Sequence, residues 1–195
     1  MIALITLLLL PGAHANKVTQ GQQASQVCAA CHGEKGNSPT TIGPKLAGQH
    51  PKYLIEQMTA FAKGKQRSDP SMNSLMLGLS TEDKTNIAAF YAQQSIQIGA
   101  AKPEDIKRGE SLYRGGDIKK HITACIACHG PRGLGNAQAG FPALGGQHPN
   151  YTIKQLVDFK EGKRTTDLNN IMQDIASRMD KKDMQAVANY IYGLH

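Results

Sequence analysis

The spacing of apolar and polar positions predicts helices throughout the chain. Tyr53, Gln57 and Phe61 recur every four residues, so they share one face of a helix. The same order and spacing of tyrosine, glutamine and phenylalanine recurs over 151–159. Because each half carries a helix of the same pattern, the predicted fold class is all-α.

Proline and glycine mark the ends of these two helices. Pro51 and Pro149 stand where a first-turn proline belongs, because a proline there gives up no helical hydrogen bond. Gly64 and Gly162 follow the last periodic positions and are expected to end the helices.

A second pair of helices is predicted nearer the end of each half. Ser80 is followed by acidic residues, a pattern typical of an N-cap, and the helix is expected to extend to about Gln94. Asp180 and Asp183 open its counterpart, which extends to about Tyr192. The two halves therefore share one order of helices.

The chain is an internal duplication. The sequence GPKLAGQHPKY at 43–53 matches FPALGGQHPNY at 141–151, an offset of 98 residues. This period is far longer than the repeat of a solenoid, so each copy is expected to be a whole domain. Glycine and proline within 96–103 mark the linker. The predicted domains are 16–100 and 101–195.

The first fifteen residues have the pattern of a secretory signal peptide. Met1–Leu10 is almost wholly apolar, and Ala-His-Ala at 13–15 offers a cleavage site before Asn16. No Lys or Arg precedes the apolar run, which departs from the usual pattern, and the alternative is a buried apolar N-terminal helix. No later stretch is long and apolar enough to span a bilayer. The mature chain, from Asn16, is expected to be soluble and periplasmic.

Two copies of Cys-x-x-Cys-His, at 28–32 and 125–129, contain every cysteine of the chain. Two thiols at this spacing can reach the two vinyl groups on one edge of a porphyrin, and the next residue then directs its imidazole at the iron. The motif therefore predicts two covalently attached haem c groups. The predicted attachment residues are Cys28, Cys31, Cys125 and Cys128. His32 and His129 are the predicted proximal ligands.

Met72 and Met172 are the predicted sixth ligands of the two irons. Each lies eight residues before the N-cap position of the final helix of its half, Ser80 or Asp180, in a stretch of low regularity that is predicted to be a loop between two helices. A thioether at this place can return over the haem, and His/Met ligation suits electron transfer. Met76 is the rival in the first half, but Ala176 replaces it in the second.

Other repeated residues have two interpretations each. His50 and His148 are alternative ligands, although a polar residue before a proline-started helix explains them better. Pro44 and Pro142 are either simple turn prolines or carbonyl acceptors for the second N–H of each proximal histidine. Five side chains could bond the haem propionates, although aromatic packing and solvated charge explain them equally well. They are Tyr53, Tyr151, Arg114, Lys65 and Lys163.

Composition and charge add two constraints. Aromatic residues make up 5% of the chain and tryptophan is absent, so a buried haem would supply apolar bulk that each half lacks. The formal net charge is +7, divided as +3 over 16–100 and +4 over 101–195. An even excess without a basic run favours an acidic protein partner or an anionic membrane surface over nucleic acid.

Three classes of function are compatible with two such motifs. An electron carrier needs both irons closed, whereas an enzyme such as a di-haem peroxidase needs one iron with an open site. Two matching methionine positions argue against that asymmetry. A structural zinc protein is disfavoured by the histidine after each cysteine pair and by the exported context.

Taken together, the two haem motifs, the two QHP blocks and the paired methionines resemble the di-haem cytochrome c4 family. The resemblance covers the whole mature chain and implies two tandem class I cytochrome c domains related by a pseudo-twofold axis. It implies haems that lie close at the interface, joined through propionate hydrogen bonds, with axial pairs His32/Met72 and His129/Met172. It also implies a periplasmic electron carrier, not an enzyme, that often associates peripherally with the membrane and delivers electrons to a terminal oxidase or a similar respiratory partner.

Overall fold

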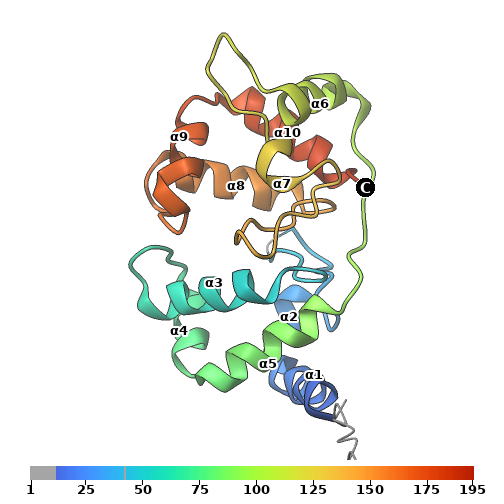
Figure 1. Cartoon of the computed structure of the whole chain (residues 1–195), viewed down its shortest axis with the longest axis vertical. Helices are drawn as coiled ribbons and strands as arrows, with labels where there is room; N and C mark the ends of the chain where they lie inside the picture. The colour runs from blue at the N-terminus through green and yellow to red at the C-terminus, as the bar shows by residue number, and fades with distance from the viewer. Residues whose placement is uncertain (1–11, 42) are drawn as a thin grey trace, which may run out of the picture.

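The computed structural model describes residues 12–41 and 43–195, which fold into helices joined by loops (Figure 1). Within these residues the only β-pairing is two isolated bridges, Asp117 with Ile122 and Asn136 with Phe141. The first half contains α1 (Gly12–Ala24), α2 (Gln26–His32), α3 (Pro51–Lys63), α4 (Pro70–Leu77) and α5 (Thr81–Ala92). The second half contains η1 (Pro103–Asp105), α6 (Ile106–Gly115), α7 (Ile126–His129), α8 (Pro149–Lys160), η2 (Leu168–Asn170), α9 (Ile171–Ser177) and α10 (Lys181–Tyr192).

The predicted signal peptide, residues 1–15, lies mostly outside the described residues. Helix α1 begins at Gly12 and passes through the predicted cleavage point before Asn16. Cleavage at that point stays a prediction. Across the described ranges, no helix combines the length and the apolar character that a membrane span requires.

Each domain contains one close helix crossing, and the two crossings are alike. Helix α1 packs against α5, and α6 packs against α10. The backbones approach closely at glycines: a Cβ on Gly21 would lie 2.0 Å from the carbonyl oxygen of Asn86, and one on Gly109 would lie 2.2 Å from that of Ala186. The glycines therefore set the distance between the paired helices.

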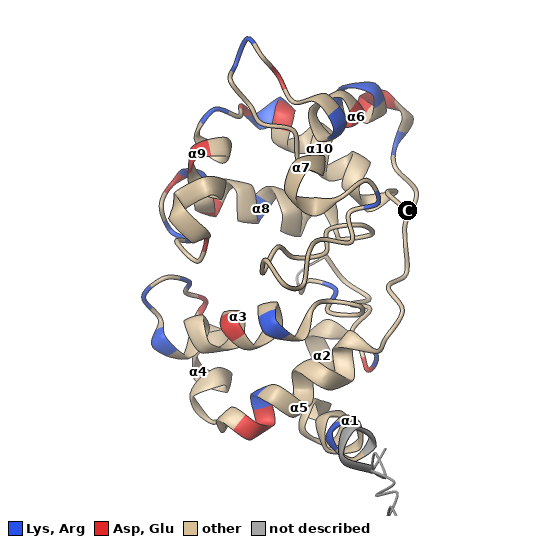
Figure 2. Cartoon of the chain, in the orientation of Figure 1, with Lys and Arg blue, Asp and Glu red and all other residues tan. Residues whose placement is uncertain are grey.

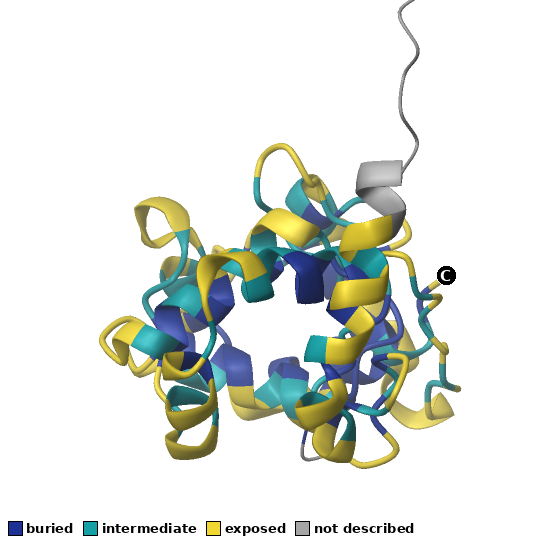
Figure 3. Cartoon of the chain, turned by 90° about the horizontal axis from the view of Figure 1, so that it is seen from below, coloured by how far each residue is buried: buried dark blue, intermediate teal, exposed yellow. Residues whose placement is uncertain are grey.

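Each domain has its own hydrophobic core. Seen from below, buried positions of the lower domain lie on the inward faces of its helices and exposed positions on the outward faces (Figure 3). The first core centres on Leu54, Met58, Phe61, Met76, Ile87, Ala88, Phe90 and Tyr91. The second centres on Leu112, Tyr113, Ile122, Leu156, Phe159, Ala176, Met179, Met184, Val187, Tyr190, Ile191 and Leu194.

The sequence predicted most helix boundaries. Helices α3 and α8 begin at Pro51 and Pro149, and Gly64 ends α3 in the left-handed conformation. Helix α8 ends at Lys160, two residues before Gly162. Both α5 and α10 begin with a capping box, in which the side chains of the cap and the third helical residue bond each other's backbone N–H groups.

The predicted loops around the two methionines are wrong, because both stretches are helical. Met72 lies in the first turn of α4, where Asp69 accepts hydrogen bonds from the backbone N–H of Ser71 and Met72. Pro70 occupies the first helical position. Met172 is the second residue of α9. An aspartate cap and a first-turn proline signal the start of a helix. The signal is easily missed where the helix that follows is too short to show a period.

Reciprocal hydrogen bonds join the two domains. The Gln49 side chain bonds both backbone groups of Ala143 at 2.9 Å. The Gln147 side chain bonds both backbone groups of Lys45, also at 2.9 Å. Because each domain gives the other the same contact, the two domains are related by an approximate twofold axis.

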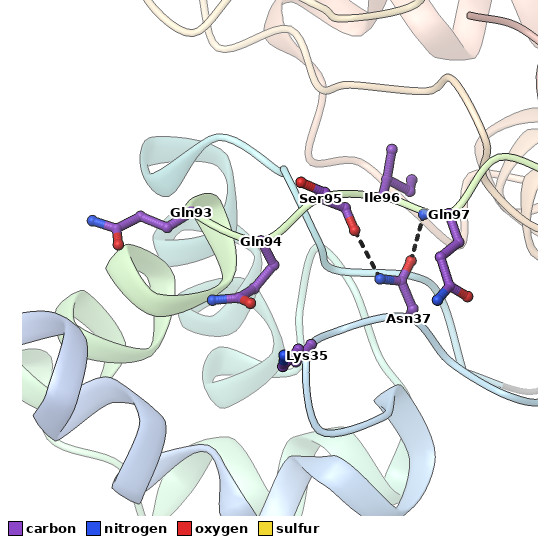
Figure 4. A pocket seen from close by; sticks show the side chains of 7 residues that line it. All are labelled: Lys35, Asn37, Gln93, Gln94, Ser95, Ile96 and Gln97. Atoms are coloured by element: carbon purple, nitrogen blue, oxygen red, sulfur yellow. Dashed lines mark hydrogen bonds between the residues drawn. The ribbon is translucent and has the colours of Figure 1, made fainter.

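Hydrogen bonds hold the linker to both domains. The Asn37 side chain bonds the carbonyl of Ser95 and the N–H of Gln97, as the dashed lines of Figure 4 show. The N–H of Gly99 donates to the carbonyl of Tyr192 at 3.1 Å. The linker also borders a pocket lined by Lys35, Asn37, Gln93, Gln94, Ser95, Ile96 and Gln97.

Candidate haem-binding sites

Each Cys-x-x-Cys-His motif forms a short helix that positions its thiols and its histidine. The first motif occupies the end of α2, and the second begins at the N-cap of α7. Gly33 and Gly130 follow the histidines with φ of 76°, a conformation that favours glycine, and turn the chain away. The four cysteines form no disulfide. The thiols of both motifs are therefore available for thioether bonds.

The two motif histidines are held in the state that an iron ligand requires. His32 and His129 are each 6% exposed. Their Nδ1 atoms lie 2.9 Å from the carbonyl oxygens of Pro44 and Pro142, respectively. A carbonyl can only accept, so Nδ1–H donates and Nε2 keeps its lone pair. Burial lowers the pKa of both imidazoles, which favours the neutral form.

Of the two interpretations of Pro44 and Pro142, the structure shows the carbonyl acceptor. The chain also closes tightly on the first motif: a Cβ on Gly43 would lie 2.5 Å from the carbonyl oxygen of Cys31 and 3.3 Å from His32 Nδ1. The loop that carries the acceptor therefore has a fixed place against the histidine. A hydrogen bond of this kind orients the ring of a metal ligand and raises its basicity.

In each domain one motif cysteine and one methionine border the core of that domain. Cys28 and Met72, both partly buried, pack against the first core. Cys125 and Met172 pack against the second core in the same way. Met76, in contrast, is 2% exposed and belongs to the first core itself. The methionine that recurs in both halves therefore lies at the edge of each core, and the unpaired one fills the interior.

His50 and His148 cap α3 and α8, as their place before a proline suggested. Their rings also cross the domain interface. His50 Nε2 lies 2.8 Å from the carbonyl oxygen of Leu134, and His148 Nε2 lies 3.1 Å from that of Ser38. These contacts use the ring nitrogen that a distal ligand would need.

Four of the five residues suggested for the haem propionates have other partners. Arg114 Nε donates to the Tyr190 hydroxyl at 2.9 Å, and Lys163 pairs with Glu161. Tyr53 and Tyr151 accept hydrogen bonds from two arginines that the sequence analysis did not single out, Arg164 and Arg67. A lone arginine in the segment after each repeated helix was the available signal.

The Tyr91 hydroxyl is a further polar group in the first core. Tyr91 is fully buried, and its hydroxyl makes no hydrogen bond of good geometry to the described residues, although Ser25 and Cys28 lie close enough to affect its pKa. Burial raises the pKa of this phenol, which therefore stays protonated and able to donate. Free thiols, a buried neutral imidazole, an edge thioether and an unpaired buried phenol all fit a haem with polar edge groups.

Two domains of this fold, each with such a donor set, define a tandem c-type cytochrome. The family model described as cytochrome c matches the chain twice, over residues 18–95 and 106–195. Cytochrome c4 of Pseudomonas aeruginosa is 48% identical over 194 residues, which is 98% of this chain and 96% of that protein. The chain belongs to the cytochrome c4 family.

The solved structures agree with this assignment. Reduced recombinant cytochrome c4 from Pseudomonas stutzeri is similar with a TM-score of 0.87 and 43% identity, over 91% of this chain and 98% of that one. A protein named thiosulfate dehydrogenase electron acceptor, from Thiomonas intermedia, is 37% identical over 84% of this chain and 76% of its own length. The chain is therefore a di-haem electron carrier with one covalently attached haem c in each domain.

Proposed function

We propose that this protein is a periplasmic electron carrier without enzymatic activity, and that it delivers electrons to a terminal oxidase or a similar respiratory partner. The observation that carries the proposal is the likeness of the two sites. Each domain has a buried, neutral histidine, and a methionine at the edge of its own core. A carrier needs two closed irons of this kind, whereas a di-haem peroxidase needs one open iron.

The proposed axial pairs are His32 with Met72 and His129 with Met172, and the proposed attachment residues are the four motif cysteines. A thioether opposite an imidazole raises the reduction potential of the haem. It also keeps the iron six-coordinate in both oxidation states, so little of the site reorganises when an electron arrives. These properties suit a carrier near the high-potential end of a respiratory chain.

The proposed periplasmic location rests on the apolar segment at 1–15 and on the haem attachment chemistry. The proposed mature chain has its domain boundary near residue 100, inside the fastened linker. Lys and Arg are distributed over both domains rather than gathered at one end (Figure 2), and the net charge is +7. We infer docking on an acidic protein surface, with peripheral attraction to anionic lipid and no role in nucleic-acid binding.

The name of one relative points to a possible electron donor for this chain. Because the Thiomonas intermedia protein is named an electron acceptor of thiosulfate dehydrogenase, a dehydrogenase of this type is the second candidate partner. It would be the donor to this chain, whereas the oxidase is the acceptor, so both partners can belong to one route.

Rapid mixing tests the proposal. The reduced protein should be oxidised by oxidase-containing membranes in air, and the rate should fall as salt rises from low to physiological concentration. Its visible spectrum should show two low-spin haems. Peroxide turnover together with a high-spin component would instead identify an enzyme, and rates that do not change with salt would reject steering by net charge.

A further inference from the structure

One buried hydroxyl of the first domain has no hydrogen-bond partner of good geometry. It belongs to Tyr91, which lies in α5 and is fully buried. Among the described residues, it is the one buried side-chain polar group without such a bond. Almost all buried polar groups in native proteins have a partner, because a buried donor without an acceptor costs free energy. The hydroxyl therefore indicates an acceptor that arrives with the cofactor of this domain.

The ring that carries this hydroxyl has a fixed place. A Cβ on Gly36 would lie 2.7 Å from Tyr91 Cδ1, so the backbone turn at Gly36 lies directly against the phenol. The Phe90 ring lies beside it, with 5.1 Å between the ring centroids. The Tyr91 carbonyl accepts a hydrogen bond from the N–H of Gly48 at 2.9 Å. The hydroxyl is therefore held in the core, where it cannot turn toward solvent for a partner.

Two residues lie near the Tyr91 hydroxyl, Cys28 and Ser25. Burial raises the pKa of Tyr91, and both of these residues contribute to that pKa. Cys28 packs against the core to which Tyr91 belongs, and the phenol opposes the rise in pKa that burial gives the Cys28 thiol. Ser25 Oγ donates to the Gln22 carbonyl at 3.0 Å. The candidate acceptors are thus the Cys28 sulfur and the Ser25 oxygen.

Haem attachment changes Cys28 and leaves Ser25 as it is. A thiol carries its own S–H donor, whereas a thioether sulfur can only accept a hydrogen bond. Attachment also fixes the sulfur to the porphyrin, at the edge opposite the propionates. The acceptor that arrives with the cofactor is therefore the Cys28 sulfur.

The second domain lacks a tyrosine at the matching position. The cap residues Ser80 and Asp180 align α5 with α10 at an offset of 100 residues. This offset places Ile191, which is also buried, where the first domain has Tyr91. An isoleucine side chain has no donor, so α10 offers no hydroxyl to the second haem at this position.

The buried phenol of the second domain comes from α6 instead, and its donor is already used. Tyr113 is fully buried and lies near Cys125, whose charge adds to burial in raising the pKa of this phenol. Counted from the glycine of each close helix crossing, Tyr113 has the position of Ser25. Its hydroxyl donates to the Gly130 carbonyl at 2.7 Å. The two domains therefore differ: one phenol proton is free and the other is bound by the backbone.

We propose that the Tyr91 hydroxyl donates a hydrogen bond to the thioether sulfur at Cys28 and thereby raises the reduction potential of the first haem. The positive end of the O–H dipole then points at the haem edge and disfavours the oxidised, more positively charged iron. The second haem lacks this bond, so one hydroxyl makes two otherwise similar sites unequal. The inference rests on the proposed attachment of the first haem at Cys28.

A spectroelectrochemical titration of the holoprotein, with the two haems distinguished by the NMR signals of their methyl groups, tests the effect. Tyr91→Phe removes the oxygen and keeps the ring. It should shift the reduction equilibrium of the first haem about twofold toward the oxidised form, as expected of one weak hydrogen bond. At 59 mV per tenfold change this is a fall of about 18 mV. The potential of the second haem should stay unchanged.

Tyr113→Phe is the matched control. It removes the same oxygen from a buried phenol near the other attachment cysteine, but the bond that it breaks is with the Gly130 carbonyl. It should lower the thermal stability and leave both potentials unchanged. Ser25→Ala removes the competing acceptor and should also leave both potentials unchanged.

Resonance Raman spectroscopy of the wild-type holoprotein detects the bond directly. The carbon–sulfur stretching band of the first haem should shift after complete exchange into deuterium oxide, because the bonded hydrogen becomes deuterium. The band should not shift in Tyr91→Phe. If that variant does not incorporate haem, the wild-type measurement decides, and a band that does not respond to deuterium would contradict the proposal.

Three further results would overturn the inference. Unchanged potentials with lower thermal stability in Tyr91→Phe would assign the tyrosine to packing alone. An equal fall of both potentials would show that the effect is not local to the first haem. A fall in Ser25→Ala as large as that in Tyr91→Phe would assign the bond to Ser25. In each case, two low-spin haems in the visible spectrum would leave the proposed electron-carrier function standing.

Discussion

At the scale of single residues, each domain holds its proposed proximal ligand in one protonation state. The Nδ1–H groups of His32 and His129 donate to proline carbonyls at 2.9 Å, so Nε2 of each ring carries no proton. The sequence predicted both histidines and offered the carbonyl acceptors as one of two interpretations of the prolines, because the motif and the following proline recur in both halves. Repetition was the information that separated these residues from ordinary loop residues.

We expect Met72→Ala to open the iron of the first domain and Met76→Ala to leave it closed. The thioether of Met72 lies at the edge of the first core, whereas that of Met76 fills the interior. Loss of a sulfur ligand should lower the potential of that haem and allow it to bind carbon monoxide or cyanide, as measured by the visible spectrum. Met172→Ala should do the same in the second domain.

The two methionine variants of the first domain control each other. Met76→Ala should cost about 2–5 kcal/mol of stability through the cavity that it leaves, while the iron stays low-spin. The opposite result, an open iron in Met76→Ala only, would shift the ligand by one helical turn. If neither variant opens the iron, the His/Met assignment of that domain fails.

The two arginines of the interface show where sequence reasoning ends at this scale. Arg67 and Arg164 stand in polar segments after helices, where an exposed arginine is the ordinary expectation. Their burial depends on which faces of α3 and α8 meet, and that pairing joins residues about a hundred positions apart. Local pattern carries no information on such a contact.

At the scale of the helix, the two close crossings make a stability prediction. Gly21→Ala and Gly109→Ala each place a Cβ within about 2 Å of a backbone carbonyl oxygen of the partner helix. Backbone atoms cannot move aside as a flexible side chain can, so we expect a loss of roughly 2 kcal/mol or more in the free energy of unfolding. Denaturant titration of the holoprotein measures it.

Gly115→Ala is the control for these two glycine variants. Gly115 ends α6, and an added Cβ there meets no atom within 4 Å. The change should be neutral or stabilise by up to about 1 kcal/mol, because alanine restricts the unfolded chain. Equal effects of all three substitutions would show that the crossings tolerate a methyl group.

The start of α10 makes a prediction about acid stability. Asp183 is 4% exposed at its side chain and bonds Lys120 at 2.7 Å and Arg108 at 2.6 Å. Burial alone would raise its pKa, but these hydrogen bonds outweigh burial and hold the pKa below the usual value. Such a carboxylate stabilises the fold above the pKa of the unfolded state, about 3.9. That stability is lost as pH falls through the lower folded pKa.

Asp183→Asn should therefore be less stable than wild type at pH 7, and the difference should shrink as pH falls below about 4. The difference between the two unfolding curves removes effects that both proteins share, such as protonation of the iron ligands. Asp174→Asn, which breaks an exposed pair with Arg178, should change stability little at any pH. A difference for Asp183→Asn that grows in acid would reverse the assigned sign.

The sequence predicted long helices better than short ones. The bounds of α3, α5 and α10 follow from their prolines, glycines and capping residues, whose effects are local. Helices α4 and α9 have only eight and seven residues, too few to show a period. In α9 the start is further hidden, because Asn169 and Asn170 adopt positive φ just before it.

At the scale of the whole molecule, two domains that fold by the same rules are joined into one unit. Paired glutamine contacts, two histidine contacts and the hydrogen bonds of Arg67 and Arg164 all cross the interface. The linker is bonded to both domains. The duplication predicted two equal domains. Their mutual arrangement came from the resemblance to a family, because no local pattern states which surfaces of two equal domains meet.

The last prediction concerns this arrangement. Gln49→Ala and Gln147→Ala together remove four interdomain hydrogen bonds of 2.9 Å and leave the backbone groups of Ala143 and Lys45 unpaired. We expect a loss of roughly 1–3 kcal/mol for each glutamine. The domains should separate more often, so the linker at 96–103 should be cut faster by protease and the radius of gyration from X-ray scattering should rise.

Gln94→Ala is the matched control for the double variant. Its side chain bonds the Phe90 carbonyl of the same domain at 2.9 Å and makes no such bridge. It should leave both the cleavage rate and the radius of gyration unchanged. Because separation of the domains also parts the two haem sites, electron exchange between them should slow only in the double variant. If electron exchange and protease cleavage of the double variant both stay unchanged, the contacts of His50, His148, Arg67 and Arg164 are enough to hold the domains together.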